Sequence, residues 1–302
     1  GFVRYRGCPN PAWATNFMSA VFGALSCGLV ALLVARAARS VASPQAGAHA
    51  KSFAAAVAAG IFFSISHTMW SQSVITETYT LTLFCIILFL ATSLVWLSRP
   101  SRGAAFGLAA VFGLGLAQSH IIILLVPCLI LALVLSNPRL CREFCLANAF
   151  IWILPCVLLR AGLANPWFWV AATSSCVLGF ALPLRLSASG STALGMLAII
   201  AAGIAFYAYL PLASEGNPPM QFGYARTWDG FQHVITRGQY ERIMPTTVLS
   251  LQFLDQLRWY ACLLCQEYIC PLALAAFLPI VRVSRFRGPS LKWWCTCLLA
   301  FF

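Results

Sequence analysis

Nine apolar segments, each close to the length that crosses a lipid bilayer, follow one another along this sequence. A membrane-spanning helix needs about 20 mainly apolar residues, within a range of roughly 17 to 25. The chain is 61% hydrophobic and only 9% charged, whereas soluble domains carry about 25% charged residues. Because so apolar a surface would aggregate in water, we expect a lipid bilayer to be its solvent. The sequence therefore predicts an all-α fold, a polytopic transmembrane helical bundle.

The expected spans alternate between the two sides of the membrane. They are Phe17–Ala35, Ser52–Met69, Tyr79–Leu97, Ala104–Ser119, His120–Ser136, Phe144–Leu159, Trp167–Leu184, Thr192–Leu212 and Gln266–Val281. A tenth run, Leu291–Phe302, begins another span but is truncated, since its residues reach only about 18 Å at 1.5 Å per residue. The sequence opens at Gly1 without Met and stops inside that run, so we expect a fragment cut at both ends. Residues 1–302 are expected to form a single membrane domain.

Basic residues divide unevenly between the two sides of this arrangement. Twelve of the 19 Lys and Arg residues fall in one set of loops, namely Arg36, Arg39, Lys51, Arg99, Arg102, Arg139, Arg142, Arg185, Arg282, Arg285, Arg287 and Lys292. The excess of Lys and Arg in cytoplasmic loops predicts that this set is cytoplasmic. Six of the seven acidic residues then lie on or at the edge of the outer face: Glu77, Glu215, Asp229, Glu241, Asp255 and Glu267. This asymmetry marks the outer face as the chemically interesting one.

Two short outer turns carry polar residues that suit a functional site. Glu77 lies between the second and third spans, and a carboxylate at a membrane edge is costly to desolvate and often functional. The alternative is that Glu77 solvates its turn or caps the next helix. His120, in the next outer turn, suits phosphate binding or proton transfer, or it anchors its helix at the interface.

The largest segment outside the membrane is the outer loop 213–256. Arg237, Gln239 and Tyr240 lie close together in it, and Arg donates a planar fork of hydrogen bonds to a phosphate. Trp228 offers an aromatic face on which a sugar ring can stack. Ordinary loop packing is the alternative, because Arg and Trp are also common interfacial anchors. The loop runs into Thr247–Tyr260, which we expect to be an amphipathic helix lying on the membrane.

Several partners and cofactors are excluded by what the sequence lacks. The net charge of +12 comes without dense basic runs interleaved with aromatic residues, so no nucleic acid is expected. The 13 Cys residues show no metal-binding spacing, and most lie in apolar runs where Cys acts as a small hydrophobic residue. No Gly-rich phosphate loop is present, so we expect neither a metal nor a cofactor.

Four groups of residues, in order along the chain, resemble the motifs of one family. They are Asn16–Ala24 at the start of a span, Trp70-Ser71-Gln72 with Glu77-Thr78-Tyr79 in an outer turn, Gly113–Leu116 with His120 in the next hairpin, and Tyr209–Leu212, Asn217-Pro218-Pro219, Gly230-Phe231 and Arg237–Tyr240 in the outer loop. The family is domain of unknown function 2723, which includes protein O-mannosyltransferases of the transmembrane protein 260 type and many bacterial relatives. The resemblance covers most of residues 16–281.

The resemblance implies a C-type membrane glycosyltransferase. Such an enzyme takes a sugar, such as mannose, from a polyprenyl-phosphate carrier at the outer face and transfers it to a protein or glycan acceptor. The expected substrate-binding residues are His120, Arg237, Gln239, Tyr240, Trp228 and Asn217. We expect an integral protein of the bacterial inner membrane, with the endoplasmic reticulum membrane as the alternative.

The family's catalytic acid is expected in a loop before Asn16, but residues 1–15 contain no Asp or Glu. We therefore expect this fragment to lack that acid and to transfer no sugar alone. Glu77 then serves as an acceptor-side or structural carboxylate, and as the base only if its turn reaches the same cavity. A lipid or solute transporter or flippase and a non-catalytic envelope scaffold subunit remain alternatives, although no ionisable residue lies in the middle of a span, as ion-coupled transport requires.

Overall fold

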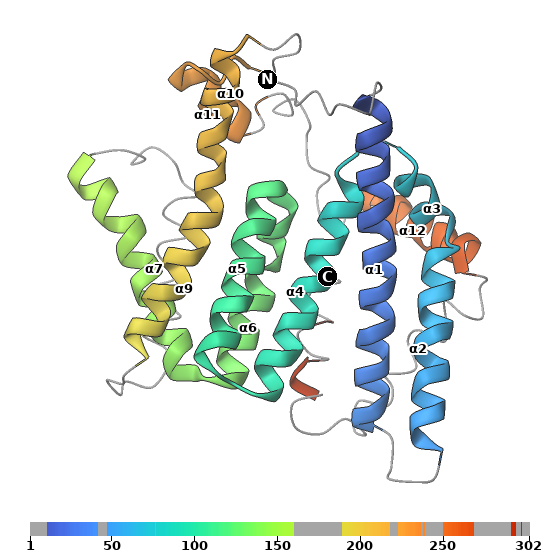
Figure 1. Cartoon of the computed structure of the whole chain (residues 1–302). Helices are drawn as coiled ribbons and strands as arrows, with labels where there is room; N and C mark the ends of the chain where they lie inside the picture. The colour runs from blue at the N-terminus through green and yellow to red at the C-terminus, as the bar shows by residue number, and fades with distance from the viewer. Residues whose placement is uncertain are drawn as a thin grey trace.

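The computed structural model describes residues 11–41, 47–75, 77–159, 189–217, 223–236, 238, 250–268, 291–293 and 297. The elements in this part of the chain are helices (Figure 1), as the sequence predicted. Their bounds are α1 Pro11–Val41, α2 Ala48–Ser64, α3 His67–Ser73, α4 Tyr79–Ser98, α5 Arg102–Gln118, η1 His120–Leu125, α6 Val126–Ser136, α7 Pro138–Leu159, α9 Gly190–Ile204, η2 Ala205–Ala208, α10 Tyr209–Glu215, α11 Trp228–Ile235 and α12 Leu251–Tyr268.

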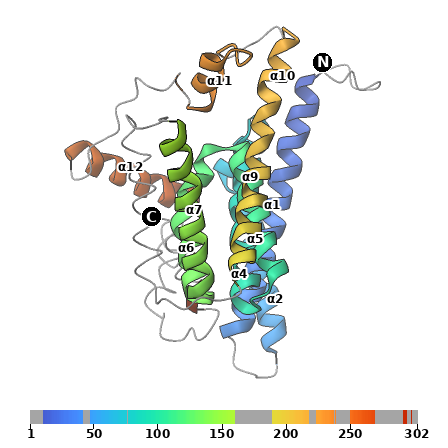
Figure 2. The same ribbon diagram turned by 90° about the vertical axis from the view of Figure 1, so that its left-hand side faces the viewer.

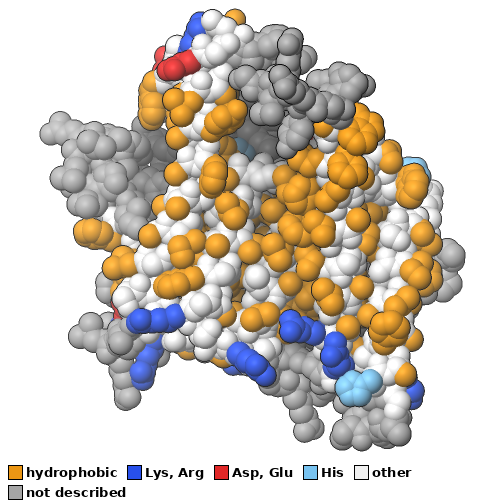
Figure 3. All heavy atoms as spheres, viewed as in Figure 1, with side chains coloured by type: hydrophobic (Ala, Val, Ile, Leu, Met, Phe, Trp, Pro, Cys, Tyr) orange, Lys and Arg blue, Asp and Glu red, His pale blue; other side chains and the backbone are white. Residues whose placement is uncertain are grey.

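The long helices run up and down beside one another, so the chain's polar segments collect at two ends (Figure 1). One end, here called the basic end, holds the end of α1, the start of α2 and the α4–α5 and α6–α7 connections. Lys and Arg side chains line this edge of the molecule in Figure 3, below a face covered by hydrophobic side chains. The other end, here called the acidic end, holds the turn between α3 and α4, the end of α10 and α11 (Figure 1). Glu77 belongs to that turn, Glu215 ends α10, and Asp229 is in the first turn of α11. Every described basic residue of the expected cytoplasmic set belongs to an element or turn at the basic end.

Within the described residues, fewer helices qualify as membrane spans than the sequence predicted. Among the described residues, three stretches are long and apolar enough to cross a membrane: Ala12–Arg39, Tyr79–Ser98 and Gly190–Glu215. A bent pair of helices would make a fourth, and Arg102–Gln118 and His120–Ser136 are apolar but shorter. Nine complete spans are therefore not supported. The expected spans 167–184 and most of 266–281 lie outside the described residues, as does most of 291–302.

The expected span Ser52–Met69 contains a bend that the sequence did not predict. Helix α2 ends at Ser64, α3 starts at His67, and the two are bent by 63°. Ser66 has an extended backbone and its hydroxyl accepts a hydrogen bond from the Met69 amide, 3.3 Å away. A Ser in this position is a strong helix N-cap. The apolar run therefore contains a helix start that its hydropathy concealed.

The hairpin expected at His120 also differs from two plain helices. Ser119 is extended, and its hydroxyl accepts from the Ile121 amide at 3.4 Å. The chain then continues as the 3₁₀ helix η1 before α6, which has Pro127 in its first turn. Serine again starts a new helix, so the hydrophobic run is divided into shorter pieces.

The buried core lies among α4, α5, α6, α7 and α9. Helices α5 and α9 approach closely because each has a glycine at the crossing: a Cβ placed on Gly203 would lie 2.4 Å from the Gly113 carbonyl carbon. Trp293 is buried against this core, and its indole nitrogen donates to the Leu90 carbonyl at 2.9 Å. Small residues at helix contacts are typical of membrane bundles, since they let backbones come together.

Helix α12 lies across the bundle rather than along it (Figures 1 and 2). None of its residues is buried. It confirms that a helix forms in the segment Thr247–Tyr260, although the described helix begins at Leu251 and ends at Tyr268. The expected span from Gln266 is corrected at its start, because Gln266–Tyr268 is the last turn of this crosswise helix.

Candidate functional site

The first two motif regions contact each other near the acidic end. The buried Ser19 hydroxyl of α1 donates to the backbone carbonyl of Glu77 at 3.1 Å. One turn further along α1, a Cβ on Gly23 would lie 2.4 Å from the Ser73 hydroxyl oxygen of α3. That hydroxyl is held by the Met69 carbonyl at 2.7 Å. The motif Asn16–Ala24 therefore holds α3 and the turn after it in place.

The third motif region, between Gly113 and His120, also contacts the acidic end. Its Gln118 forms hydrogen bonds to residues at the start of α4. The Thr82 hydroxyl donates to the Gln118 side-chain oxygen at 3.0 Å, and the Gln118 amide nitrogen donates to the Thr78 carbonyl at 3.3 Å. His120 lies with its ring centroid 5.7 Å from that of Tyr207, whose hydroxyl donates to the Leu116 carbonyl at 3.0 Å. The turns at 77–79 and 118–120 are thus linked to one another and to η2.

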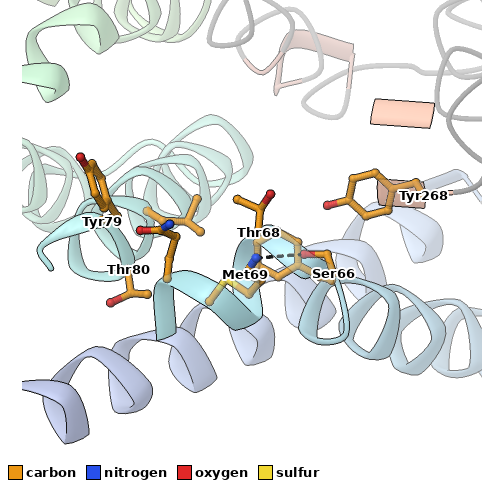
Figure 4. Close-up of a pocket in the computed structure, with 9 residues that line it drawn as sticks. Ser66, Thr68, Met69, Tyr79, Thr80 and Tyr268 are labelled. Atoms are coloured by element: carbon orange, nitrogen blue, oxygen red, sulfur yellow. Dashed lines mark hydrogen bonds between the residues drawn. The ribbon is translucent and has the colours of Figure 1, made fainter. Parts of the chain in front are cut away.

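A cavity lies between α3, the start of α4 and the end of α12. We call it the α3–α4 cavity; its volume is about 490 Å³, and its lining is Phe63, Ser66, Thr68, Met69, Gln72, Tyr79, Thr80, Leu83 and Tyr268. Tyr79 and Tyr268 stand on opposite sides of it, with Thr68 between them (Figure 4). Ligand sites commonly occupy about 300–1,000 Å³ and combine apolar walls with a few polar groups, as this cavity does.

Two polar atoms of the lining residues lack a partner. The Gln72 side-chain oxygen and the Thr80 hydroxyl are buried, and neither has a hydrogen-bond partner in the described part of the chain. Leaving such a group unsatisfied costs about 1–3 kcal/mol, and an unpaired buried group in a native fold needs an explanation. Gln72 ends the Trp-Ser-Gln motif and Thr80 follows the Glu-Thr-Tyr motif, so both motifs contribute to this lining.

A second cavity, here called the α3–α12 cavity, adjoins the first. It has a volume of about 840 Å³, and its lining is His67, Thr68, Trp259, Tyr260, Leu263, Leu264, Gln266, Glu267 and Tyr268. One carboxylate oxygen of Glu267 accepts a hydrogen bond from the Thr68 amide at 2.6 Å. A carboxylate is favourable beside the first amides of a helix, so Glu267 attaches α12 to the start of α3.

The expected site residues that the structure describes line neither cavity. Glu77 is exposed, its turn is held through its backbone, and its side chain lines neither cavity. His120 is half-buried beside Tyr207. Trp228 is 69% exposed at the start of α11.

The remaining expected residues lie in or near the outer loop. The side-chain oxygen of Asn217 accepts from the Arg226 guanidinium at 2.8 Å, and its φ of 43° is left-handed, a conformation that Asn tolerates better than most residues. Arg237, Gln239 and Tyr240 lie outside the described residues, so the structure does not test their assignment.

Sequence reasoning missed the residues that line the cavities. Ser66, Thr68, Thr80 and Tyr268 were not singled out, and Gln72 was noted only as part of a motif. A signal was present for Ser66, because Ser followed by a helical apolar run marks a helix start. Tyr268 is 188 positions beyond Thr80 in the sequence. Nothing in the sequence indicated that the two residues would line the same cavity.

The part of the chain that matches a known family includes α3 and the start of α4, which form most of the lining of the α3–α4 cavity. Residues 6–141 match the family model described as the protein O-mannosyl-transferase TMEM260 N-terminal domain. This match confirms the resemblance seen in the motifs between Asn16 and His120, and it stops before the outer-loop motifs. No curated protein and no solved structure matches the chain.

Proposed function

From the match of residues 6–141 to the model of the protein O-mannosyl-transferase TMEM260 N-terminal domain, we propose that the chain is part of a membrane glycosyltransferase. We propose that its sugar site is the α3–α4 cavity. The donor is a sugar, such as mannose, on a polyprenyl-phosphate carrier. The acceptor is a hydroxyl group of a protein or glycan. The acidic end faces the outer side of the membrane, and the basic end faces the cytoplasm, in agreement with the distribution of Lys and Arg.

The reaction exchanges one bond at the anomeric carbon for another. The acceptor hydroxyl oxygen forms a bond to that carbon, and the bond from the carbon to the phosphate oxygen breaks. The polyprenyl phosphate leaves with the electron pair, and a carboxylate takes the proton of the acceptor hydroxyl. General-base assistance of this kind contributes roughly 10²–10⁴-fold to a rate. We assign that proton to the family's catalytic acid, which is expected before Asn16. Glu77, whose side chain lines neither cavity, is assigned to the acceptor side as a structural carboxylate.

The observation that carries the proposal is the pair of buried, unpartnered polar atoms on Gln72 and Thr80. A sugar presents hydroxyl groups that both donate and accept, so one bound sugar satisfies an amide oxygen and a threonine hydroxyl together. Tyr79 and Tyr268, on opposite sides of the cavity, offer ring faces to the sugar (Figure 4). The apolar walls beside them suit the first part of a lipid carrier.

The phosphate of the donor needs cationic or hydrogen-bonding stabilisation as it leaves. We assign this role to Arg237, whose planar guanidinium forms paired hydrogen bonds to phosphate oxygens, with Gln239 and Tyr240 beside it. His120, Asn217 and Trp228 remain proposed substrate contacts from the same end of the molecule. The membrane is proposed to be the bacterial inner membrane or that of the endoplasmic reticulum.

Because the chain is expected to lack the catalytic acid, the test is donor binding: the affinity of the intact chain in proteoliposomes for polyprenyl-phosphate mannose. Gln72→Ala and Thr80→Val each remove a hydrogen bond worth about 1–2 kcal/mol, so each should raise the Kd for the donor by about 5- to 30-fold. Thr92→Val is the matched control, because the Thr92 hydroxyl donates to the Leu88 carbonyl and lines neither cavity. A Kd that is unchanged in both cavity variants would move the sugar site elsewhere, and no donor binding by the unmodified chain would contradict the proposed function.

A further inference from the structure

The two cavities share part of their walls. Thr68 and Tyr268 line both the α3–α4 cavity and the α3–α12 cavity. Figure 4 shows the two residues on the same side of the α3–α4 cavity, Thr68 on α3 and Tyr268 at the end of α12. A ligand in either cavity therefore lies directly beside a ligand in the other.

A glycosyltransferase requires this kind of adjacency. Its two substrates must meet with the reacting atoms about 3–3.5 Å apart. If the donor sugar occupies the α3–α4 cavity, the acceptor must approach from a space that borders it. The α3–α12 cavity borders it through Thr68 and Tyr268, and it is the larger of the two, at about 840 Å³ against about 490 Å³.

The lining of the α3–α12 cavity suits a peptide. Trp259 and Tyr260 are aromatic, and they are 66% and 56% exposed, so they are accessible to a ligand. Leu263 and Leu264 add aliphatic surface, and Gln266 presents an amide that can both donate to and accept from a peptide backbone. Aromatic side chains supply large contact areas at low entropic cost. A glycan, which is mostly hydroxyl groups, would gain little from the two leucines.

Helix α12 provides most of these residues without being packed into the bundle. None of its residues is buried, and the Glu267 carboxylate fixes its last turn to the Thr68 amide. That hydrogen bond sets the position of Gln266 and Tyr268 on either side of Glu267. The shape of the cavity therefore depends on one contact between the end of α12 and the start of α3.

We propose that the α3–α12 cavity is the acceptor site and that it binds an extended peptide carrying a Ser or Thr hydroxyl. The proposal rests on the proposed function, because it takes the neighbouring cavity as the donor site. Glu267 is a positioning residue in this account: it holds α12 against α3, so that the peptide hydroxyl is directed past Thr68 toward the sugar.

Ligand protection of single cysteines separates the two sites. In the full chain with its native cysteines replaced, Gln266→Cys reports on the α3–α12 cavity and Leu83→Cys on the α3–α4 cavity. Leu251→Cys is the control on the same helix as Gln266, since Leu251 is 82% exposed and lines neither cavity. A membrane-impermeant maleimide labels each variant with or without a Ser/Thr-containing peptide, a soluble oligosaccharide, or polyprenyl-phosphate mannose.

The peptide should slow labelling at position 266 at least fivefold and leave position 251 unchanged. Unchanged labelling at 266 with the peptide, protection of 266 by the oligosaccharide instead, or protection of 266 by the donor alone would each overturn the proposal. Peptide protection at 266 together with no donor protection at 83 would support the peptide site and contradict the proposed sugar site. A second variant, Trp259→Ala, should raise the Kd for the peptide about tenfold with the Kd for the donor unchanged, and equal Kd values for the peptide would overturn the proposal.

Discussion

The crossing of α5 and α9 predicts a large effect from the smallest possible side chain. A Cβ on Gly203 would lie 2.4 Å from the carbonyl carbon, 2.6 Å from the carbonyl oxygen and 2.8 Å from the Cα of Gly113. These are backbone atoms, which cannot rotate away as the end of a side chain does. Gly203→Ala therefore forces the two helices apart, and overpacking of this kind costs about 1–3 kcal/mol.

Gly107 of α5 is the matched control, because a Cβ there meets nothing within 4 Å. Gly107→Ala should stabilise the chain by about 0.8–1.0 kcal/mol, the helix-propensity difference between Ala and Gly. With Gly203→Ala near 2 kcal/mol destabilising, the two variants should differ by about 3 kcal/mol.

The measurement is thermal unfolding of the intact chain in lipid nanodiscs. A free-energy difference of about 3 kcal/mol corresponds to roughly 6–12 °C in Tm for a chain of a few hundred residues. Gly107→Ala should unfold above the unmodified chain and Gly203→Ala below it. If Gly203→Ala unfolds at or above the temperature of the unmodified chain, the close backbone contact of α5 and α9 does not exist as described.

Three further predictions concern α3, α12 and the orientation of the bundle. Ser66→Ala removes the N-cap of α3 and should destabilise the chain by about 1 kcal/mol, seen as a lower Tm; an unchanged Tm would argue against a helix start at this point. Glu267→Ala should release the end of α12 and speed hydrogen exchange of its backbone amides. Asp255→Ala, on the same helix but lining neither cavity, should not speed this exchange. Equal exchange in the two variants would refute the attachment of α12 to α3 through Glu267. In a background without native cysteines, a membrane-impermeant thiol reagent applied to intact cells should label Asp229→Cys and not Ser101→Cys, and the reverse pattern would invert the proposed orientation.

The helical class and the ends of most helices could be predicted from the sequence because charge and hydropathy control them. Arg99 and Arg102 flank the α4–α5 turn as expected, and Tyr79 starts α4 as expected. Hydropathy does not detect a cap, however, since a serine inside an apolar run changes the average little. Ser66 begins a new helix inside the expected span Ser52–Met69, which is why that bend was not predicted, whereas the expected boundary between Ser119 and His120 is confirmed.

The candidate site could be predicted only in part. The motifs around Gln72 and Tyr79 were recognised, and these residues line the α3–α4 cavity. The other wall comes from Tyr268 on α12, and its position depends on how a crosswise helix meets α3. Such tertiary contacts leave no periodic signal in the sequence. Glu77 was singled out for its charge, but the structure uses its backbone carbonyl to hold the turn.

Photo-crosslinking of the donor tests the central claim most directly. A polyprenyl-phosphate mannose with a diazirine on the sugar, bound to the intact chain and activated by light, should modify residues of α3 and the start of α4, within 66–73 and 79–83. Excess unlabelled donor should prevent this modification, and Thr80→Val should reduce it. Modification confined to the basic end of the bundle, or to residues that line neither cavity, would contradict the assignment of the α3–α4 cavity as the sugar site.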